Sequence, residues 1–189
     1  MIRIALVGDI GSGKTYIASL FGYPVFNADS VVAEIYKKNK KCFNSIKKKL
    51  PNFFSSFPLK KKELIKCILA NKTNLKKISK IIHPLVRKQM KIFIHKNNKK
   101  KFVILDIPLF LENRLNKKND VIIYVQSSKT RINKRLKKRV NYNRKLIVKF
   151  KKVQWPLKKK KSKSDLIIKN KFKHKEALKS VNSILKDII

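Results

Sequence analysis

The sequence predicts an α/β fold, a three-layer sandwich in which helices cover a parallel five-stranded sheet. Two observations predict this class. Short runs of consecutive apolar residues alternate with longer segments of helical spacing, a pattern typical of parallel sheets buried on both faces. The first apolar run also leads directly into a glycine-rich loop at residues 8–15 and then into a helical segment, an order typical of nucleotide-binding folds.

The glycine-rich loop fits the P-loop NTPase pattern G-x-x-x-x-G-K-[ST], with Gly8, Gly13, Lys14 and Thr15 at the defined positions. Glycine lets backbone N–H groups approach phosphate oxygens, the lysine ammonium reaches the β- and γ-phosphates, and the threonine hydroxyl can bind Mg²⁺. The alternative is a chance glycine-rich turn, but three of the chain's 4 glycines fall in this loop. We therefore predict that ATP and Mg²⁺ bind here, with Lys14 also catalytic and Thr15 a metal ligand. The predicted nucleotide contacts in the loop are Gly11, Ser12, Gly13, Lys14, Thr15 and Tyr16.

The elements follow in order from the spacing of apolar residues. Apolar runs predict strands at residues 2–7, 23–29, 101–110 (a strand that ends in Asp106), 120–127 and 165–170. Helical spacing predicts helices at residues 15–21, 128–139 and 175–189, and over most of the Lys-rich segment 30–97. Within that segment we expect helix breaks at residues 50–58 and at the His83–Pro84 pair. The chain is therefore one domain with a core (residues 1–29, 101–138 and 163–189), a helical insert (about 30–97) and a small basic lid (about 139–155).

The formal net charge is +40, from 50 Lys and Arg residues against 10 Asp and Glu residues. Such a charge is typical of nucleic-acid-binding proteins. However, the basic residues are nearly all Lys, are spread along the chain and accompany many Asn and Ile residues, as an A/T-rich coding sequence would produce. Aromatic residues that could stack on bases are interleaved with basic ones only weakly, at residues 149–155. We therefore expect salt-sensitive, non-specific binding and no specific nucleic-acid partner.

The sequence contains no run of about 18 apolar residues and no signal-peptide pattern. We therefore expect a cytoplasmic protein that does not span a membrane. We also expect the protein to be a monomer. Cys42 and Cys67 lack the C-x-x-C spacing and are expected to be free thiols.

The scarcity of acids narrows the choice of catalytic residues. Phosphoryl transfer needs Mg²⁺ near the phosphates and a group that orients or deprotonates the acceptor hydroxyl. Asp120 and Asp165 begin strands, whereas Asp29 and Asp106 follow strands, at the edge where ligands bind in open parallel sheets. We select Asp29 as the catalytic carboxylate and Asp106 as a ligand of the metal and a substrate contact. A helix N-cap for Asp29 and a structural strand-end role for Asp106 are the alternatives, and Glu112 is a weaker candidate for holding a lid or an acceptor group.

The layout also separates classes of nucleotide-binding protein. A GTP-binding switch would carry D-x-x-G and N-K-x-D, and neither occurs here. A motor-type ATPase would carry more acids beyond its second strand. Two inserts beside a compact core favour a small-molecule kinase, in which one insert binds the acceptor and the other closes over ATP and excludes water.

Over almost its full length the chain resembles the dephospho-coenzyme A kinases. Residues 8–15 are similar to that family's G-G-I-G-S-G-K-[ST] loop, and "NADSVVAEI" (27–35) resembles its D-A-D segment. Three more specific segments follow in the family's order: H-P-L-[VI] at residues 83–86, D-[IV]-P-L-L-x-E at 106–112, and Q-x-P-x-x-x-K-x-x-x-A-D-x-x-I-x-N at 154–170.

The resemblance implies transfer of the γ-phosphate of ATP to the ribose 3′-hydroxyl of dephospho-CoA, giving CoA and ADP. It implies that Asp29 is the base, that the helical insert binds the acceptor, and that the lid lies near residues 139–154. Arg135 and Arg139 would hold phosphates as fixed donor groups. The residues that the resemblance assigns to the acceptor are His83, Pro84, Asp106, Pro108 and Glu112.

Several positions depart from the family pattern, among them Lys158 and Lys159, which stand at lid positions that are rich in Glu in the family. Asn27 replaces the first Asp of D-A-D and removes a carboxylate that would help to organise Mg²⁺ or water. Asp9 replaces a glycine next to the phosphates, where a negative side chain must turn outward or meet the metal. Ala33 replaces an arginine that would contact the acceptor. Two alternatives stay open: another P-loop nucleoside or nucleotide kinase, and a basic nucleic-acid-binding ATPase.

Overall fold

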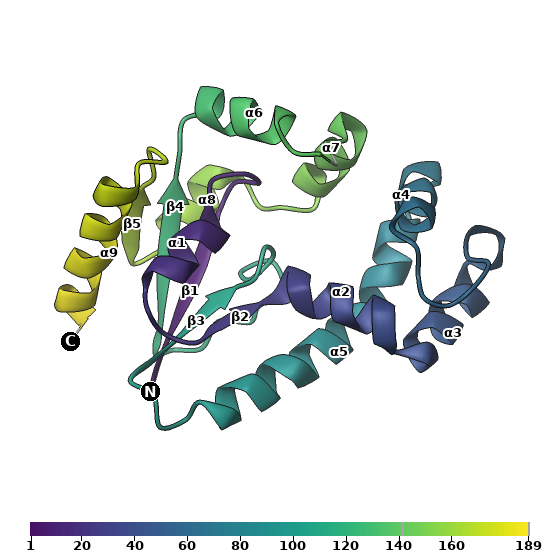
Figure 1. Ribbon diagram of the computed structural model, residues 1–189, viewed down its shortest axis with the longest axis horizontal. Helices are drawn as coiled ribbons and strands as arrows, with labels where there is room; N and C mark the ends of the chain where they lie inside the picture. The colour runs from purple at the N-terminus through teal and green to yellow at the C-terminus, as the bar shows by residue number, and fades with distance from the viewer. Residues whose placement is uncertain (141, 189) are drawn as a thin grey trace. The chain divides into compact units, whose positions relative to one another are not determined.

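The computed structural model describes residues 1–140 and 142–188 (Figure 1). Asn141, within the predicted lid, and Ile189, at the end of the last predicted helix, lie outside the described residues. The chain forms two compact units, one of residues 1–27 and 97–189 and the other of residues 28–96. The first unit contains the sheet and the glycine-rich loop, and the second contains four α-helices and a short 3₁₀ helix.

The first unit is built on a parallel five-stranded sheet, as predicted. Its strands are β1 (Ile2–Gly8), β2 (Val25–Asn27), β3 (Phe102–Asp106), β4 (Asp120–Gln126) and β5 (Leu166–Lys169). Their order is β2-β3-β1-β4-β5, and every neighbouring pair is parallel. The register aligns both Leu6 of β1 and Asn27 of β2 with Asp106 of β3. The carboxyl ends of these three strands therefore meet where the glycine-rich loop leaves β1, at the edge where ligands bind.

Apolar strands and amphipathic helices form the core of this unit. All five residues of β3 are buried, as is β1 from Arg3 onward. The strands pack against α1 (Lys14–Leu20) and α9 (His174–Ile188), which contribute Ile17 and Val181 to one apolar cluster. Burial of such side chains contributes about 1.5–3 kcal/mol each, which offsets the entropy lost on folding.

Three further helices precede β5 in this unit. They are α6 (Lys129–Lys137), α7 (Arg144–Lys152) and α8 (Leu157–Ser162). α6 buries Ile132 and Leu136, which are four residues apart on one face. α8 packs against β1, whereas α7, within the predicted lid, has no buried residue. α7 is therefore held by contacts at the surface of the unit and not by a core.

The second unit consists of α2 (Ala28–Lys38), α3 (Lys40–Lys49), the 3₁₀ helix η1 (Pro51–Phe53), α4 (Lys61–Ala70) and α5 (Asn74–Lys96). α5 packs against α2, α3 and α4. The predicted helix break at His83–Pro84 is wrong, because α5 continues through Pro84. A proline inside a helix removes one hydrogen bond and costs about 3 kcal/mol. The buried stripe of Ile78, Ile82 and Met90 on the same helix compensates for that cost.

Cys42 and Cys67, both in the second unit, are buried and free, as predicted. Burial raises the pKa of the Cys42 thiol to about 11, so it is a neutral thiol at pH 7. Across the described residues, no helix combines the length and the apolar character needed to cross a bilayer.

Candidate functional site

The glycine-rich loop connects the end of β1 to the start of α1. Gly8, Gly11 and Gly13 have positive φ angles of 147°, 86° and 95°. A Cβ atom on Gly8 would lie 2.6 Å from the carbonyl oxygen of Val125 in β4, and one on Gly13 would lie 2.3 Å from Nδ2 of Asn170. Both the turn and the close approach of its neighbours therefore require glycine.

The Lys14 side chain is folded into this loop and is buried. Its Nζ donates to the carbonyl oxygen of Asp9 at 2.9 Å and lies 3.4 Å from that of Gly8. Ser12, in the same loop, is fully buried, and its hydroxyl has no hydrogen-bond partner within the described part of the chain. A buried cation beside an unsatisfied hydroxyl is an environment that suits an anionic ligand such as a phosphate.

Thr15, Asp106 and Asn27 meet at the carboxyl ends of β2 and β3. The Thr15 hydroxyl donates to Oδ2 of Asp106 at 2.6 Å, and the Asn27 amide donates to the same oxygen at 2.7 Å. Asn27 stands where the resembled family has Asp. An amide at this position donates a hydrogen bond to Asp106, whereas a second carboxylate would repel it. The two residues predicted as metal ligands, Thr15 and Asp106, are in direct contact.

These two oxygens fit the chemistry of Mg²⁺. Mg²⁺ prefers oxygen ligands and is usually held by one or two protein groups together with waters and phosphate oxygens. In residues 1–140 and 142–188, no group of three or more His, Cys, Asp or Glu side chains could hold a metal by itself. A Mg²⁺ ion at Thr15 and Asp106 would therefore complete its coordination with phosphate and water oxygens.

The connection from β5 to α9 holds the loop from the other side. The buried Asn170 donates from Nδ2 to the Ser12 carbonyl at 2.9 Å and from its backbone N–H to the Gln126 carbonyl at 2.8 Å. Its Oδ1 accepts from Phe172 N–H at 2.9 Å, and the Arg135 guanidinium lies 4.6 Å from the centroid of the Phe172 ring. One asparagine thus ties the end of β4 and the residues after β5 to the loop, and places Arg135 beside them.

Tyr16 and Arg139 are the other predicted nucleotide contacts. The Tyr16 hydroxyl is 2.8 Å from Nδ1 of His174 in α9. Arg139 is exposed just beyond the end of α6. Of the two predicted arginines, the structure therefore brings Arg135 next to the loop and leaves Arg139 at the surface of the same unit.

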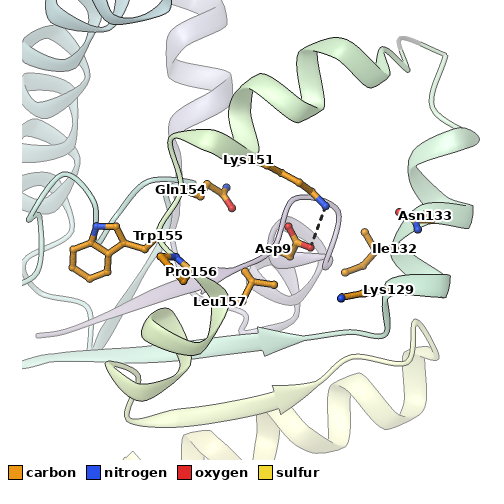
Figure 2. Close-up of a pocket in the computed structure, with 9 residues that line it drawn as sticks. All are labelled: Asp9, Lys129, Ile132, Asn133, Lys151, Gln154, Trp155, Pro156 and Leu157. Atoms are coloured by element: carbon orange, nitrogen blue, oxygen red, sulfur yellow. Dashed lines mark ion pairs between the residues drawn. The ribbon is translucent and has the colours of Figure 1, made fainter.

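A cavity of about 350 Å³ opens beside the loop at Asp9. Figure 2 shows the Asp9 carboxylate directly below the Lys151 side chain of α7, with Asn133 and Ile132 of α6 on one side. Oδ2 of Asp9 is 3.7 Å from Nζ of Lys151, and Oδ1 accepts from the Ile10 N–H at 2.7 Å. The Asp9 carboxylate is therefore paired with a cation of the predicted lid.

Glu112 and Lys160 form a buried ion pair on the same unit. Oε1 of Glu112 is 2.8 Å from Nζ of Lys160 and also accepts from the Trp155 N–H at 2.8 Å. The side chains of Glu112 and Lys160 are only 7% and 1% exposed. Glu112 thus links the turns after β3 to the start of α8, and Pro108 lies partly buried in those turns.

The second unit carries Asp29, His83 and Pro84. Asp29 is exposed in the first turn of α2, which begins at Ala28, so the alternative of an N-cap before a helix starting at Ser30 is wrong. His83 is partly buried on α5, and Pro84 is exposed. Burial lowers the pKa of His83, and the charge of Arg87, one turn along the helix, lowers it further. His83 is therefore a neutral ring at pH 7.

Two residues of the site were missed in the sequence analysis, Asn170 and Lys160. Both are fixed positions of the Q-x-P motif at residues 154–170, as its final Asn and its Lys. That motif was the signal that could have found them. Their partners, Ser12 and Glu112, lie in motifs far away along the chain.

Substitution of Gly13 by Ala should weaken ATP binding by about tenfold or more. The new Cβ would displace the Asn170 amide that holds the loop, and it adds the strain of a positive φ angle. Gly22→Ala is the matched control, because Gly22 has a φ angle of 70° and no atom within 4 Å of the added Cβ. Titration with a fluorescent ATP analogue checks this, and equal affinities for both variants would contradict it.

Comparison with known proteins identifies the relatives of this chain. A family model described as dephospho-CoA kinase matches residues 2–186. The dephospho-CoA kinase of Wolbachia sp. subsp. Brugia malayi is 30% identical over 187 residues, covering 96% of this chain and 95% of the relative. That of Bartonella quintana is 31% identical over 191 residues, covering 98% and 97%. The structure of dephospho-CoA kinase from Campylobacter jejuni superposes with a TM-score of 0.65 at 21% identity, covering 98% of this chain and 96% of that one.

Proposed function

Because this chain belongs to the dephospho-CoA kinase family, we propose a role for each of its site residues in the phosphorylation of dephospho-CoA by ATP. That ATP-dependent reaction is the last step of coenzyme A biosynthesis, and it is the activity of this chain. The acceptor group is the ribose 3′-hydroxyl of dephospho-CoA. Its oxygen forms a bond to the γ-phosphorus of ATP, the bond from that phosphorus to the β–γ bridging oxygen breaks, and ADP leaves.

The donor side of the reaction belongs to the loop. Lys14 neutralises charge on the β- and γ-phosphates, and the N–H groups of residues 11–16 bind their oxygens. Arg135, held against Phe172, supplies a fixed guanidinium next to the loop, and Arg139 is proposed to join it. Thr15 and Asp106 would hold Mg²⁺, which would offset the charge that develops on the transferring phosphoryl group. The observation that carries this proposal is the 2.6 Å contact between Thr15 Oγ1 and Asp106 Oδ2. Thr15 directly follows the buried Lys14, so the lysine and the two oxygens belong to one site.

The acceptor side belongs to Asp29 and the helical unit. Asp29 is an exposed carboxylate, and it accepts the proton of the 3′-hydroxyl as general base. His83 and Pro84 on α5, with Pro108, Glu112 and Asp106, contact the acceptor. A neutral His83 can both donate and accept a hydrogen bond, which suits a polar uncharged group of the substrate.

The remaining expectations stay predictions. They are the cytoplasmic location, the monomeric state, the absence of a specific nucleic-acid partner, and the assignment of residues 30–97 to acceptor binding and 139–155 to a lid.

The experiment that tests the function is ADP release from Mg-ATP with dephospho-CoA, beside adenosine, AMP and dTMP as acceptors. We expect turnover with dephospho-CoA alone. Turnover on a nucleoside or nucleotide control would move the chain to a neighbouring kinase class. ATP hydrolysis stimulated by RNA, without transfer to any acceptor, would support the nucleic-acid-binding alternative, whereas simple salt-sensitive RNA binding would not.

A further inference from the structure

Asp9 is a carboxylate at a position where the resembled P-loop motif has glycine. A negative side chain beside the phosphate loop should repel a triphosphate, unless its charge is compensated. The Asp9 side chain is only 12% exposed, so water does little to screen it. Burial raises the pKa of Tyr124 of β4, and the nearby Asp9 carboxylate raises it further.

Asp9 contacts two lysines, Lys14 of the loop and Lys151 of α7. Its backbone carbonyl accepts from Nζ of Lys14 at 2.9 Å, and its carboxylate lies 3.7 Å from Nζ of Lys151. Oδ1 is fixed by the N–H of Ile10 at 2.7 Å, so the carboxylate has a defined direction. Figure 2 shows this arrangement, in which Lys151 reaches down from α7 to Asp9 over the cavity.

The surroundings of this pair favour an anionic ligand. Lys129 of α6 and Lys151 of α7 both line the cavity at Asp9, so cations from two helices line the same cavity as this carboxylate. α7 itself carries five Lys and Arg residues among its nine and has no buried side chain. Its position over the loop therefore depends on surface contacts, of which the pair with Asp9 is one that reaches the loop directly.

The pair is also easily exchanged. The Lys151 side chain is 45% exposed, and ion pairs of this exposure contribute little to stability. A triphosphate in the loop carries several negative charges and is a stronger partner for an ammonium than one carboxylate. An incoming phosphate can therefore take Lys151 from Asp9.

We propose that Asp9 is a positioning residue, which holds Lys151 and with it α7 over the phosphate loop before ATP arrives, and that Lys151 then passes to the entering phosphates. This proposal rests on the proposed role of the loop in holding ATP. It accounts for the carboxylate at position 9, because the charge that would repel ATP is paired with a cation that the ligand can take over.

The experiment compares Asp9→Asn, Lys151→Gln and the double variant in ATP affinity, KM for ATP and kcat with saturating dephospho-CoA. Asn keeps an oxygen to accept from Ile10 and removes only the charge. The pair with Lys151 exists only before ATP binds, so it stabilises the nucleotide-free protein, and Asp9→Asn should bind ATP about fivefold more tightly. Lys151→Gln should bind ATP about fivefold more weakly, because it lacks the cation that passes to the phosphates, and kcat should stay nearly unchanged in both variants. In the Lys151→Gln background, Asp9→Asn should tighten ATP binding less than it does in the wild type. Lys152→Gln, which makes the same charge change at the next residue of α7, should bind ATP as the wild type does.

Trp155, the single tryptophan of the chain, gives a second readout near the end of α7. Asp9→Asn and Lys151→Gln should shift its emission in the nucleotide-free protein to the same extent, and Lys152→Gln should not. Weaker ATP binding by Asp9→Asn would overturn the proposal, because the carboxylate would then support the ATP-bound state. An equal gain from Asp9→Asn with and without Lys151 would overturn it as well, because the carboxylate would then only repel the ligand. A wild type that binds no ATP would instead overturn the proposed function.

Discussion

Asp29→Asn should lower kcat for dephospho-CoA phosphorylation by about 10²- to 10⁴-fold, the contribution of a positioned general base. The amide is close to the carboxylate in size but cannot take the proton of the attacking hydroxyl. ATP affinity should be unchanged, because the loop, Lys14 and the contact between Thr15 and Asp106 lie in the other unit and are intact. Single-turnover transfer from labelled ATP and a separate ATP titration measure the two quantities.

Glu34→Gln is the matched control for this variant. It makes the same change from carboxylate to amide on the same helix, where Glu34 is exposed and paired with Lys38 at 2.7 Å. A fully exposed pair of this kind contributes little to stability, so kcat should stay near that of the wild type. If Asp29→Asn turned over as fast as Glu34→Gln, the base would have to be another group. If Asp29→Asn lost ATP binding instead, Asp29 would belong to the donor side.

The local parts of this architecture could be predicted from the sequence. The strand, loop and helix at residues 2–21 depend on apolar spacing and on glycines within a few residues of one another. Asp106 could be found because a strand-end acid in a parallel sheet must lie at the ligand-binding edge, and it contacts Thr15 there. The continuation of α5 through Pro84 could not be predicted in the same way, because the packing that compensates for the proline comes from other helices.

The long-range contacts of the site leave little trace in the local sequence. Asn170 holds the Ser12 carbonyl across 158 positions, and although Asn170 stands in the Q-x-P motif, nothing near either residue indicates that the two are in contact. Lys160 is one of four consecutive lysines at residues 158–161, and it alone among them is buried. In a chain with so many lysines, charge and spacing do not distinguish a solvated lysine from one that pairs with Glu112 in the interior.

That buried pair gives the largest expected effect on stability. Glu112→Ala should lower the free energy of unfolding by about 3–5 kcal/mol, because it leaves the Lys160 ammonium buried without a counter-charge. It also removes the acceptor for the Trp155 N–H, a hydrogen bond to a charged group that contributes about 1.5–3 kcal/mol within the same total. Urea denaturation followed by circular dichroism measures the change, provided that both variant and wild type unfold in one transition.

Two variants separate the ion pair from the overall charge of the protein. Lys161→Met removes one positive charge from an exposed neighbour in α8, so any relief of repulsion within a +40 chain appears there too, and its effect should stay within about 0.5 kcal/mol. Lys160→Met combined with Glu112→Leu removes both buried charges and should be more stable than Glu112→Ala, because apolar side chains of similar size need no counter-ion. A Glu112→Ala protein as stable as Lys161→Met would mean that water reaches Lys160 readily. A double variant no more stable than Glu112→Ala would mean that the lost bond to Trp155, and not the stranded charge, accounts for the damage.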